Sequence, residues 1–305
     1  MNYPVRIPWK WAVPFALCSM LLPYAEGQQA DSAHPGAGYS THDTLSFLYG
    51  SSYRTPFVTT ADAPGGTDIG KATLEFVHND SWKYGSNFID FSLRKSDNGE
   101  PALGGGTGAL EVYAILRTNL SFNKIGHTKK FRAGPLRDVA LELGANLESK
   151  NSHYAPEEKT IFIGPNFQFQ IPRGFLNVGL HYRKEWNHQG IFGRNDNYDP
   201  NFNIEASWSV PVPGFRAPLF FAGFATYNTP KGRDSFGSES VSEVLIRPRV
   251  MLDAGKLLFD RRGLLEIGGG VEYWYNEYGK NTGRTPGAKQ TTPFVQLTYH
   301  LTHGG

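Results

Sequence analysis

The chain has 305 residues, of which 39% are hydrophobic, 14% aromatic and 19% charged, and its formal net charge is +2. A helical membrane protein is excluded, because a spanning helix needs roughly 20 consecutive apolar residues and no segment after residue 30 offers them. The nearly balanced charge gives no indication of a nucleic-acid partner. A membrane β-barrel remains compatible with these values, since its strands place only every second residue in lipid.

Residues 1–30 have the organisation of a secretory signal peptide. Arg6 and Lys10 precede an apolar run that ends near Pro23, and Ala30 is a small residue suited to a cleavage site. The single cysteine, Cys18, lies in this segment. We therefore predict a secreted mature chain without disulfides, whose stability depends on burial or on a closed hydrogen-bond network.

From residue 44 onward, apolar residues alternate with polar ones, which is the period of a β-strand. The alternation predicts about twelve strands, an even number as in bacterial single-chain barrels. In chain order they are expected over residues 45–49, 72–76, 89–93, 110–116, 139–147, 161–171, 176–182, 202–210, 220–224, 244–252, 265–275 and 295–301.

The connections between these segments differ in length and composition. Some are as short as "PRG" at 172–174, and others are long and polar, such as "NHQGIFGRNDNYDPN". Short turns at one end and long loops at the other are typical of outer-membrane barrels. The predicted organisation is a signal peptide over 1–30, a flexible N-terminal segment over 31–43, and an outer-membrane β-barrel over 44–305.

A soluble β-sandwich or a lipocalin-like barrel would also show alternation. The opposite face of the predicted strands favours a membrane barrel, because it carries charges of both signs that can pair inside a lumen. In 174–186, for example, Leu176, Leu180 and Tyr182 are expected to face lipid, and His181 and Arg183 to face the lumen. The fold class predicted is all-β, a transmembrane antiparallel up-and-down barrel of about 12 strands.

Nine charged residues of this second face are the candidates for lining the lumen and contacting a solute. The alternative role of each is a structural ion pair that holds the barrel wall, although Arg183→Leu is expected to spare folding and to alter conductance. The nine are Glu75, Asp90, Arg117, Asp138, Glu142, Arg183, Glu185, Arg247 and Arg249.

Aromatic residues near the predicted strand ends are candidates for interfacial girdles. Ordinary aromatic residues at strand ends are an equally good interpretation of each one. They are Trp82, Tyr84, Trp186, Trp208, Tyr227, Tyr273, Trp274 and Tyr275.

The segment "DIGKATLEFVHNDSWKYGSNFIDFSLRKSD" is interpreted as two strands joined by the turn "HNDS". It resembles the nucleoside-specific channel family of Gram-negative outer membranes, the Tsx-like and OmpK-like proteins, at Leu74–Phe76, Asp80, Trp82 and Asp90. The resemblance continues in order through "AGPLRDVALELGAN", "IFIGPNFQFQIPRGFLNVGLHYRKEW" and "VEYWYNEYG". It implies a monomeric twelve-stranded barrel with a narrow lumen that guides nucleosides, and a second role as a phage or colicin receptor.

The predicted function is passive, nucleoside-selective uptake of small polar solutes across the outer membrane. The expected partners are outer-membrane lipid, nucleosides or similar solutes, the barrel-assembly machinery, and a phage or colicin. No cofactor, metal or nucleic acid is expected. The alternatives are a receptor or adhesin that acts through its long loops, and a lipid-hydrolysing barrel enzyme. Adjacent residues of "HNDS" do not readily make the nucleophile–base geometry that hydrolysis needs.

Overall fold

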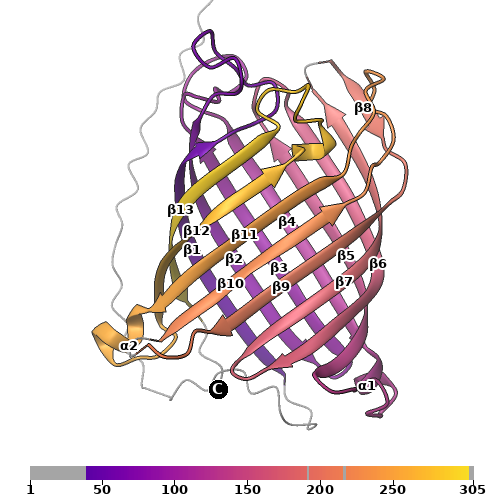
Figure 1. Ribbon diagram of the computed structural model, residues 1–305, viewed down its shortest axis with the longest axis vertical. Helices are drawn as coiled ribbons and strands as arrows, with labels where there is room; N and C mark the ends of the chain where they lie inside the picture. Colours follow the sequence, from indigo (N-terminus) through magenta and orange to yellow (C-terminus); the bar gives the residue numbers. More distant parts are fainter. Residues whose placement is uncertain (1–38, 191, 216–217, 302–305) are drawn as a thin grey trace, which may run out of the picture.

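The computed structural model describes residues 39–190, 192–215 and 218–301, which form one antiparallel β-barrel with its connections (Figure 1). The predicted signal peptide, 1–30, lies outside the described residues, as do residues 31–38 of the predicted flexible segment. Residues 40–43 of that segment belong to the first strand, which begins at Ser40.

The described residues form thirteen strands, two short α-helices and one 3-10 helix. The helices are α1 (Phe122–Ile125), α2 (Ala254–Phe259) and η1 (Glu277–Gly279). The strands are β1 (Ser40–Tyr53), β2 (Ile69–Trp82), β3 (Gly85–Ser96), β4 (Leu110–Ser121), β5 (Leu136–Lys150), β6 (Pro156–Ile171), β7 (Gly174–Gln189), β8 (Arg194–Asn197), β9 (Asn201–Pro211), β10 (Leu219–Asn228), β11 (Glu243–Asp253), β12 (Leu265–Tyr275) and β13 (Lys289–His300).

The sheet closes on itself. Each long strand pairs with the next along the chain, β1 pairs with β13, and β7 pairs with both β6 and β9. The short strand β8 extends only the tip of β7. Twelve strands therefore make a closed barrel wall, which confirms the predicted fold class, and only the short β8 has an unpaired edge among the described residues.

The two ends of the barrel differ. One end, which we call the loop end, carries the β1–β2 loop (54–68), β8, the β10–β11 loop (229–242) and the β12–β13 loop (276–288). The other, the termini end, holds Ser40, His300, α1 and α2 (Figure 1). Its turn at 172–173 is as short as predicted and the turn at 83–84 is equally short, whereas the β4–β5 and β11–β12 connections are longer and carry the two helices.

The outer surface of the wall is apolar, and the inner surface is polar. Outward side chains such as Phe47, Ile161 and Val295 are 49%, 53% and 63% exposed, whereas the inward Glu142 and Arg117 are 3% and 5% exposed. This is the reverse of a soluble protein, and only lipid can cover such a band of apolar side chains. The barrel is therefore a transmembrane one. Among the described residues, no helix is long and apolar enough to span a membrane.

Strand β10 has the opposite register from the predicted one. Ala222 and Phe224 were expected to face outward with Phe220, but they pair with Arg249 and Arg247 on the lumen face. Phe221 and Tyr227 face outward instead and are 41% and 39% exposed. The sequence "LFFAGFATY" is apolar at both sets of alternating positions, so its pattern does not decide which set faces lipid.

Two further local predictions are wrong. The motif "HNDS" lies inside β2, and the turn to β3 is formed by Lys83 and Tyr84. His78 therefore faces outward, where its Nδ1 lies 2.6 Å from Asp43, while Ser81 lies on the other face of the strand, so the motif does not converge on one site. Trp274 belongs to no girdle, because it faces inward and its Nε1 donates to Glu243 at 2.8 Å.

Candidate functional site

The lumen is the candidate site, and all nine predicted charged residues lie on its face of the wall. Cross-strand pairing places Glu75 beside Ser92, Arg117 beside Gly144, and Arg183 beside Phe162. Their part in contacting a solute stays a prediction. What the structure adds is the set of partners of each charge, which separates the nine residues into different roles.

Arg117 on β4 is the centre of a buried charged cluster. Its Nη2 lies 3.0 Å from Glu205 on β9, its Nε lies 3.4 Å from Glu142 on β5, and its Nη1 donates to Asn146 at 2.8 Å. The guanidinium carbon sits 4.4 Å from the centre of the Phe162 ring. This cation is thus held by two anions, an amide and an aromatic ring.

Glu142 is shared with two further inward side chains. Asn166 donates to it at 2.5 Å, and Nε2 of His181 lies 3.3 Å away, with Nδ1 of the same ring 2.8 Å from Asn203. Gly179 makes room for this ring, since a Cβ there would lie 2.3 Å from Cε1 of His181. A side chain at position 179 would therefore displace the imidazole, and Glu142 is held by Arg117, Asn166 and His181 as part of the wall.

Arg183 and Glu185 on β7 form a second buried cluster. They are 2.5 Å apart, Glu158 on β6 lies 3.7 Å from Arg183, and Lys231 of the β10–β11 loop lies 2.6 Å from Glu185. Both Arg183 and Glu185 are at most 5% exposed. Removing one charge from a buried, compensated group is costly. The expectation that Arg183→Leu would spare folding is therefore replaced by an expected loss of stability.

A third cluster joins the wall to the β3–β4 loop. Lys150 lies 2.6 Å from Glu100 of that loop and 3.5 Å from Glu111, and Glu111 lies 2.6 Å from Arg94. Burial favours the neutral form of Glu100, but Lys71 and Lys150 outweigh burial and hold the pKa of this carboxyl below its usual value. Sequence analysis missed Glu100 and Lys150, because neither belongs to a predicted strand segment.

Arg247 and Asp138 are also engaged. Nε of Arg247 donates to Glu272 at 2.6 Å, and Gln290 donates to the same carboxylate at 2.8 Å. Asp138 lies at the termini end, where it accepts hydrogen bonds from Ser121 and, at 2.8 Å, from Asn123 at the start of α1. Asp138 thus fixes the β4–β5 connection.

Glu75, Asp90 and Arg249 differ from the other six. Within the described ranges, none of the three forms an ion pair; Asp90 accepts one hydrogen bond, from Ser92 at 2.8 Å. Asp90 and Arg249 are half-buried, and Glu75 keeps 7% of its surface exposed. Because these side chains point into the barrel, the part that remains exposed faces the lumen.

Two loops cover the mouth at the loop end. The hydroxyl of Tyr278 in the β12–β13 loop donates to Glu148 on β5, on the far side of the ring of strands, at 3.3 Å. The β10–β11 loop binds this loop through Val241 N–H and Gly279 C=O, 2.9 Å apart. Solute that enters from this end must pass between or beside these loops.

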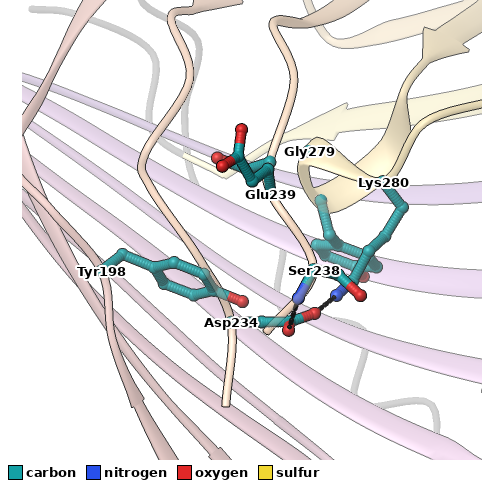
Figure 2. A pocket seen from close by; sticks show the side chains of 8 residues that line it. Tyr198, Asp234, Ser238, Glu239, Gly279 and Lys280 are labelled. Carbon is teal, nitrogen blue, oxygen red and sulfur yellow. Dashed lines mark hydrogen bonds and ion pairs between the residues drawn. The ribbon is translucent and has the colours of Figure 1, made fainter. Parts of the chain in front are cut away.

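Asp234 connects the two loops. Figure 2 shows its carboxylate between Ser238 and Lys280, with Tyr198 beside it; Lys280 Nζ is 2.5 Å away and the N–H of Ser238 donates at 2.9 Å. Burial favours the protonated form, but the hydrogen bonds from Lys280 and Ser238 outweigh it and hold the pKa of Asp234 below its usual value.

The lowered pKa of Asp234 gives an expected pH dependence. A carboxyl whose folded pKa is depressed stabilises the folded contact above its unfolded pKa, about 3.9, and this contribution is lost as pH falls through the folded pKa. We therefore expect the two loops to separate in acid below about pH 4. Asp234→Asn weakens the contact by about 1–2 kcal/mol already at pH 7. The measurement is single-channel conductance and open probability between pH 7 and 3.

Glu239→Gln is the matched control, because Glu239 lies in the same loop but its ion pair with Arg233 is about 70% exposed. It should leave the acid response unchanged. An Asp234→Asn channel that matches the unsubstituted protein at pH 7 and in acid would show that this contact does not restrain the loops.

No family model and no curated protein matches the chain. Among solved structures, it is similar to KdgM porin in complex with disordered oligogalacturonate (9% identity, TM-score 0.42, covering 84% of this chain and 98% of that one) and to NanC porin (10%, 0.44, 84% and 98%). It is also similar to the translocator domain of the autotransporter NalP from Neisseria meningitidis (10%, 0.42, 87% and 89%). At such values the likeness concerns the barrel alone, and the Tsx-like family stays a prediction.

Proposed function

We propose that this barrel is an outer-membrane channel for the passive diffusion of small polar solutes, with nucleosides as the preferred class. The observation that carries the proposal is the polarity of the wall, apolar toward lipid and charged toward the lumen on strands all around the barrel. A barrel that served only as a scaffold for its loops has no need of charged side chains that face the lumen at mid-depth without an ionic partner, as Glu75 and Arg249 do.

The chemistry of the lumen supports nucleosides as solutes. A nucleoside has a flat base that stacks on aromatic rings and a ribose that hydrogen-bonds to charged groups. Phe224 and Phe294 lie on the inner face with their ring centres 5.3 and 6.0 Å from the guanidinium carbon of Arg247. Several weak contacts of this kind suit transport better than one tight pocket, because the solute has to leave again.

The proposal includes the place of the protein in the cell. The apolar band suits insertion as a monomer into a Gram-negative outer membrane by the barrel-assembly machinery, with the loop end outside, as is usual for barrels with longer extracellular loops. The loops at that end are the surface that a phage or colicin would contact.

The test is single-channel conductance of the refolded protein, residues 31–305, in a planar bilayer with adenosine, thymidine or a sugar added. We expect a small conductance that both nucleosides block in a concentration-dependent way and that the sugar leaves unchanged. A conductance that none of the three solutes changes would contradict nucleosides as the preferred class and leave a general channel. Absence of conductance at pH 7 and also in acid would contradict the channel and favour a receptor that acts through its loops.

A further inference from the structure

Among the described residues, the three charges without ionic partners have few side chains beside them that could hold them. Arg249 on β11 pairs across the sheet with Ala222 on β10 and with Gly270 on β12. The side chains of these two neighbours, a methyl group in Ala222 and a hydrogen atom in Gly270, cannot accept hydrogen bonds from the guanidinium and are too small to pack against it. Arg117, in contrast, is held by anions and an aromatic ring, so the free state of Arg249 is a local property of its strand neighbours.

Glu75 on β2 is left free in a similar way. Its cross-strand neighbours are Ser46 on β1 and Ser92 on β3, whose hydroxyl groups would be natural partners for a carboxylate. Both hydroxyls are engaged elsewhere, since Ser46 lies 2.9 Å from the hydroxyl of Thr298 and Ser92 donates to Asp90 at 2.8 Å. The carboxylate of Glu75 therefore has acceptor capacity that faces lumen space.

The cation and the two carboxylates stand on different parts of the wall. Strand β11 is separated from β2 by β12, β13 and β1, and β3 lies one strand further. The charged groups that act on Arg249 are Glu75, Arg247, Glu266 and Asp90. Arg249 thus stands on a different part of the wall from Glu75 and Asp90, within reach of their field and without direct contact.

We propose that Glu75, Asp90 and Arg249 form the solute-contacting constriction of the channel, and that it takes small net-neutral solutes that present an acceptor or anionic group to Arg249 and donor groups to the carboxylates. This inference rests on the proposed channel function and names its site. The other six candidate charges are then structural, because each of them is held by an ion pair or by hydrogen bonds within the wall and the loops.

The physical reason for preferring net-neutral solutes is the opposition of charges. A simple cation is attracted by Glu75 and Asp90 but repelled by Arg249, and a simple anion meets the reverse. A dipolar solute can satisfy both sides at once, which offsets the cost of leaving bulk water. Zwitterions have this property, and so do nucleosides, whose ribose donates and whose base accepts hydrogen bonds.

The first experiment measures the K⁺/Cl⁻ permeability ratio, which does not depend on any organic solute. Arg249→Gln should raise the ratio severalfold, and Glu75→Gln should lower it. Arg249→Lys keeps the positive charge, so it should leave the ratio at the value of the unsubstituted channel. Arg262→Gln, which removes an equal charge from an exposed connection at the termini end, should leave it unchanged. Heat-modifiable mobility on a denaturing gel checks that each variant is folded.

The second experiment measures the entry of three solutes of matched size into proteoliposomes: β-alanine, propionate and propylammonium. The unsubstituted channel should admit β-alanine fastest. Arg249→Gln removes one charge-assisted contact with the β-alanine carboxylate. It should therefore reduce the entry of β-alanine about tenfold relative to that of propylammonium, which corresponds to about 1.4 kcal/mol.

The outcomes separate the two proposals. A protein that passes neither ions nor solutes at any pH contradicts the channel function itself. A protein that conducts, but whose permeability ratio and solute order are the same in Arg249→Gln, Glu75→Gln and the unsubstituted chain, overturns the constriction and leaves the channel. Shifts of opposite sign in the two variants, together with fast β-alanine entry, support the constriction.

Discussion

Arg117→Leu is expected to destabilise the folded barrel by about 3–5 kcal/mol, because it removes the cation from a buried group and leaves Glu205 without its 3.0 Å partner. Arg117 is 5% exposed, so water does not replace the lost contacts, and the face of Phe162 loses its guanidinium as well. The measurement is the urea midpoint of unfolding in lipid vesicles, followed by tryptophan fluorescence and by gel mobility without heating.

Arg249→Leu is the matched control, since it makes the same chemical change on the same lumen face. Arg249 has no ionic partner among the described residues, so its removal should cost less than about 1 kcal/mol. Its effect should appear in ion permeability instead. If the two substitutions shifted the urea midpoint equally, the division of the lumen charges into structural and free groups would be wrong.

The sequence pattern predicted the wall of the barrel well because one local rule governs it. Alternation has a period of two, so the assignment of one residue fixes the facing of a whole strand, and all nine candidate charges lie on the lumen face of the wall. The rule failed at β10, where both faces are apolar, and near Trp274, where an aromatic residue at a strand end turns inward to bind Glu243.

The alternation of apolar and polar residues could not predict which partner each charge has. Arg117 and Glu205 are 88 positions apart in the chain, and Tyr278 and Glu148 are 130 apart. Such contacts depend on closure of the ring and on how far a loop folds inward. One local signal was present, however. The inward glycines at 144 and 179 lie beside Arg117 and His181, where any side chain would collide with these groups.

The closed ring also explains how a chain predicted to have no disulfide keeps so many charges away from water. Neighbouring strands of the wall are hydrogen-bonded all around the ring, and most of the inward ions are compensated in clusters that include loop residues such as Lys231 and Glu100. Loop and lumen are therefore one electrostatic unit. A substitution in a loop that removes one of these partners is expected to act on the wall at mid-depth, and not merely on the surface.

Leu180→Arg is the substitution with the largest expected effect on membrane insertion. Leu180 faces outward on β7, is 43% exposed, and pairs with Ile204, another outward apolar side chain. An arginine near the bilayer midplane of a barrel costs about 2–4 kcal/mol, since the guanidinium must leave water or deform the lipid around it. The measurement is the fraction of refolded protein that becomes heat-modifiable and protease-resistant in vesicles.

Ser207→Arg is the control, because it introduces the same arginine side chain on the lumen face instead of the lipid face. Ser207 lies on the lumen face of the adjacent strand β9, half-buried and paired with Asn177 and Phe224, so the same guanidinium enters the aqueous side of the wall. It should insert nearly as well as the unsubstituted chain, and Leu180→Ile should do so too. Equal insertion of Leu180→Arg and Leu180→Ile would mean that this face of β7 does not contact lipid, because lipid accepts an isoleucine side chain and penalises an arginine.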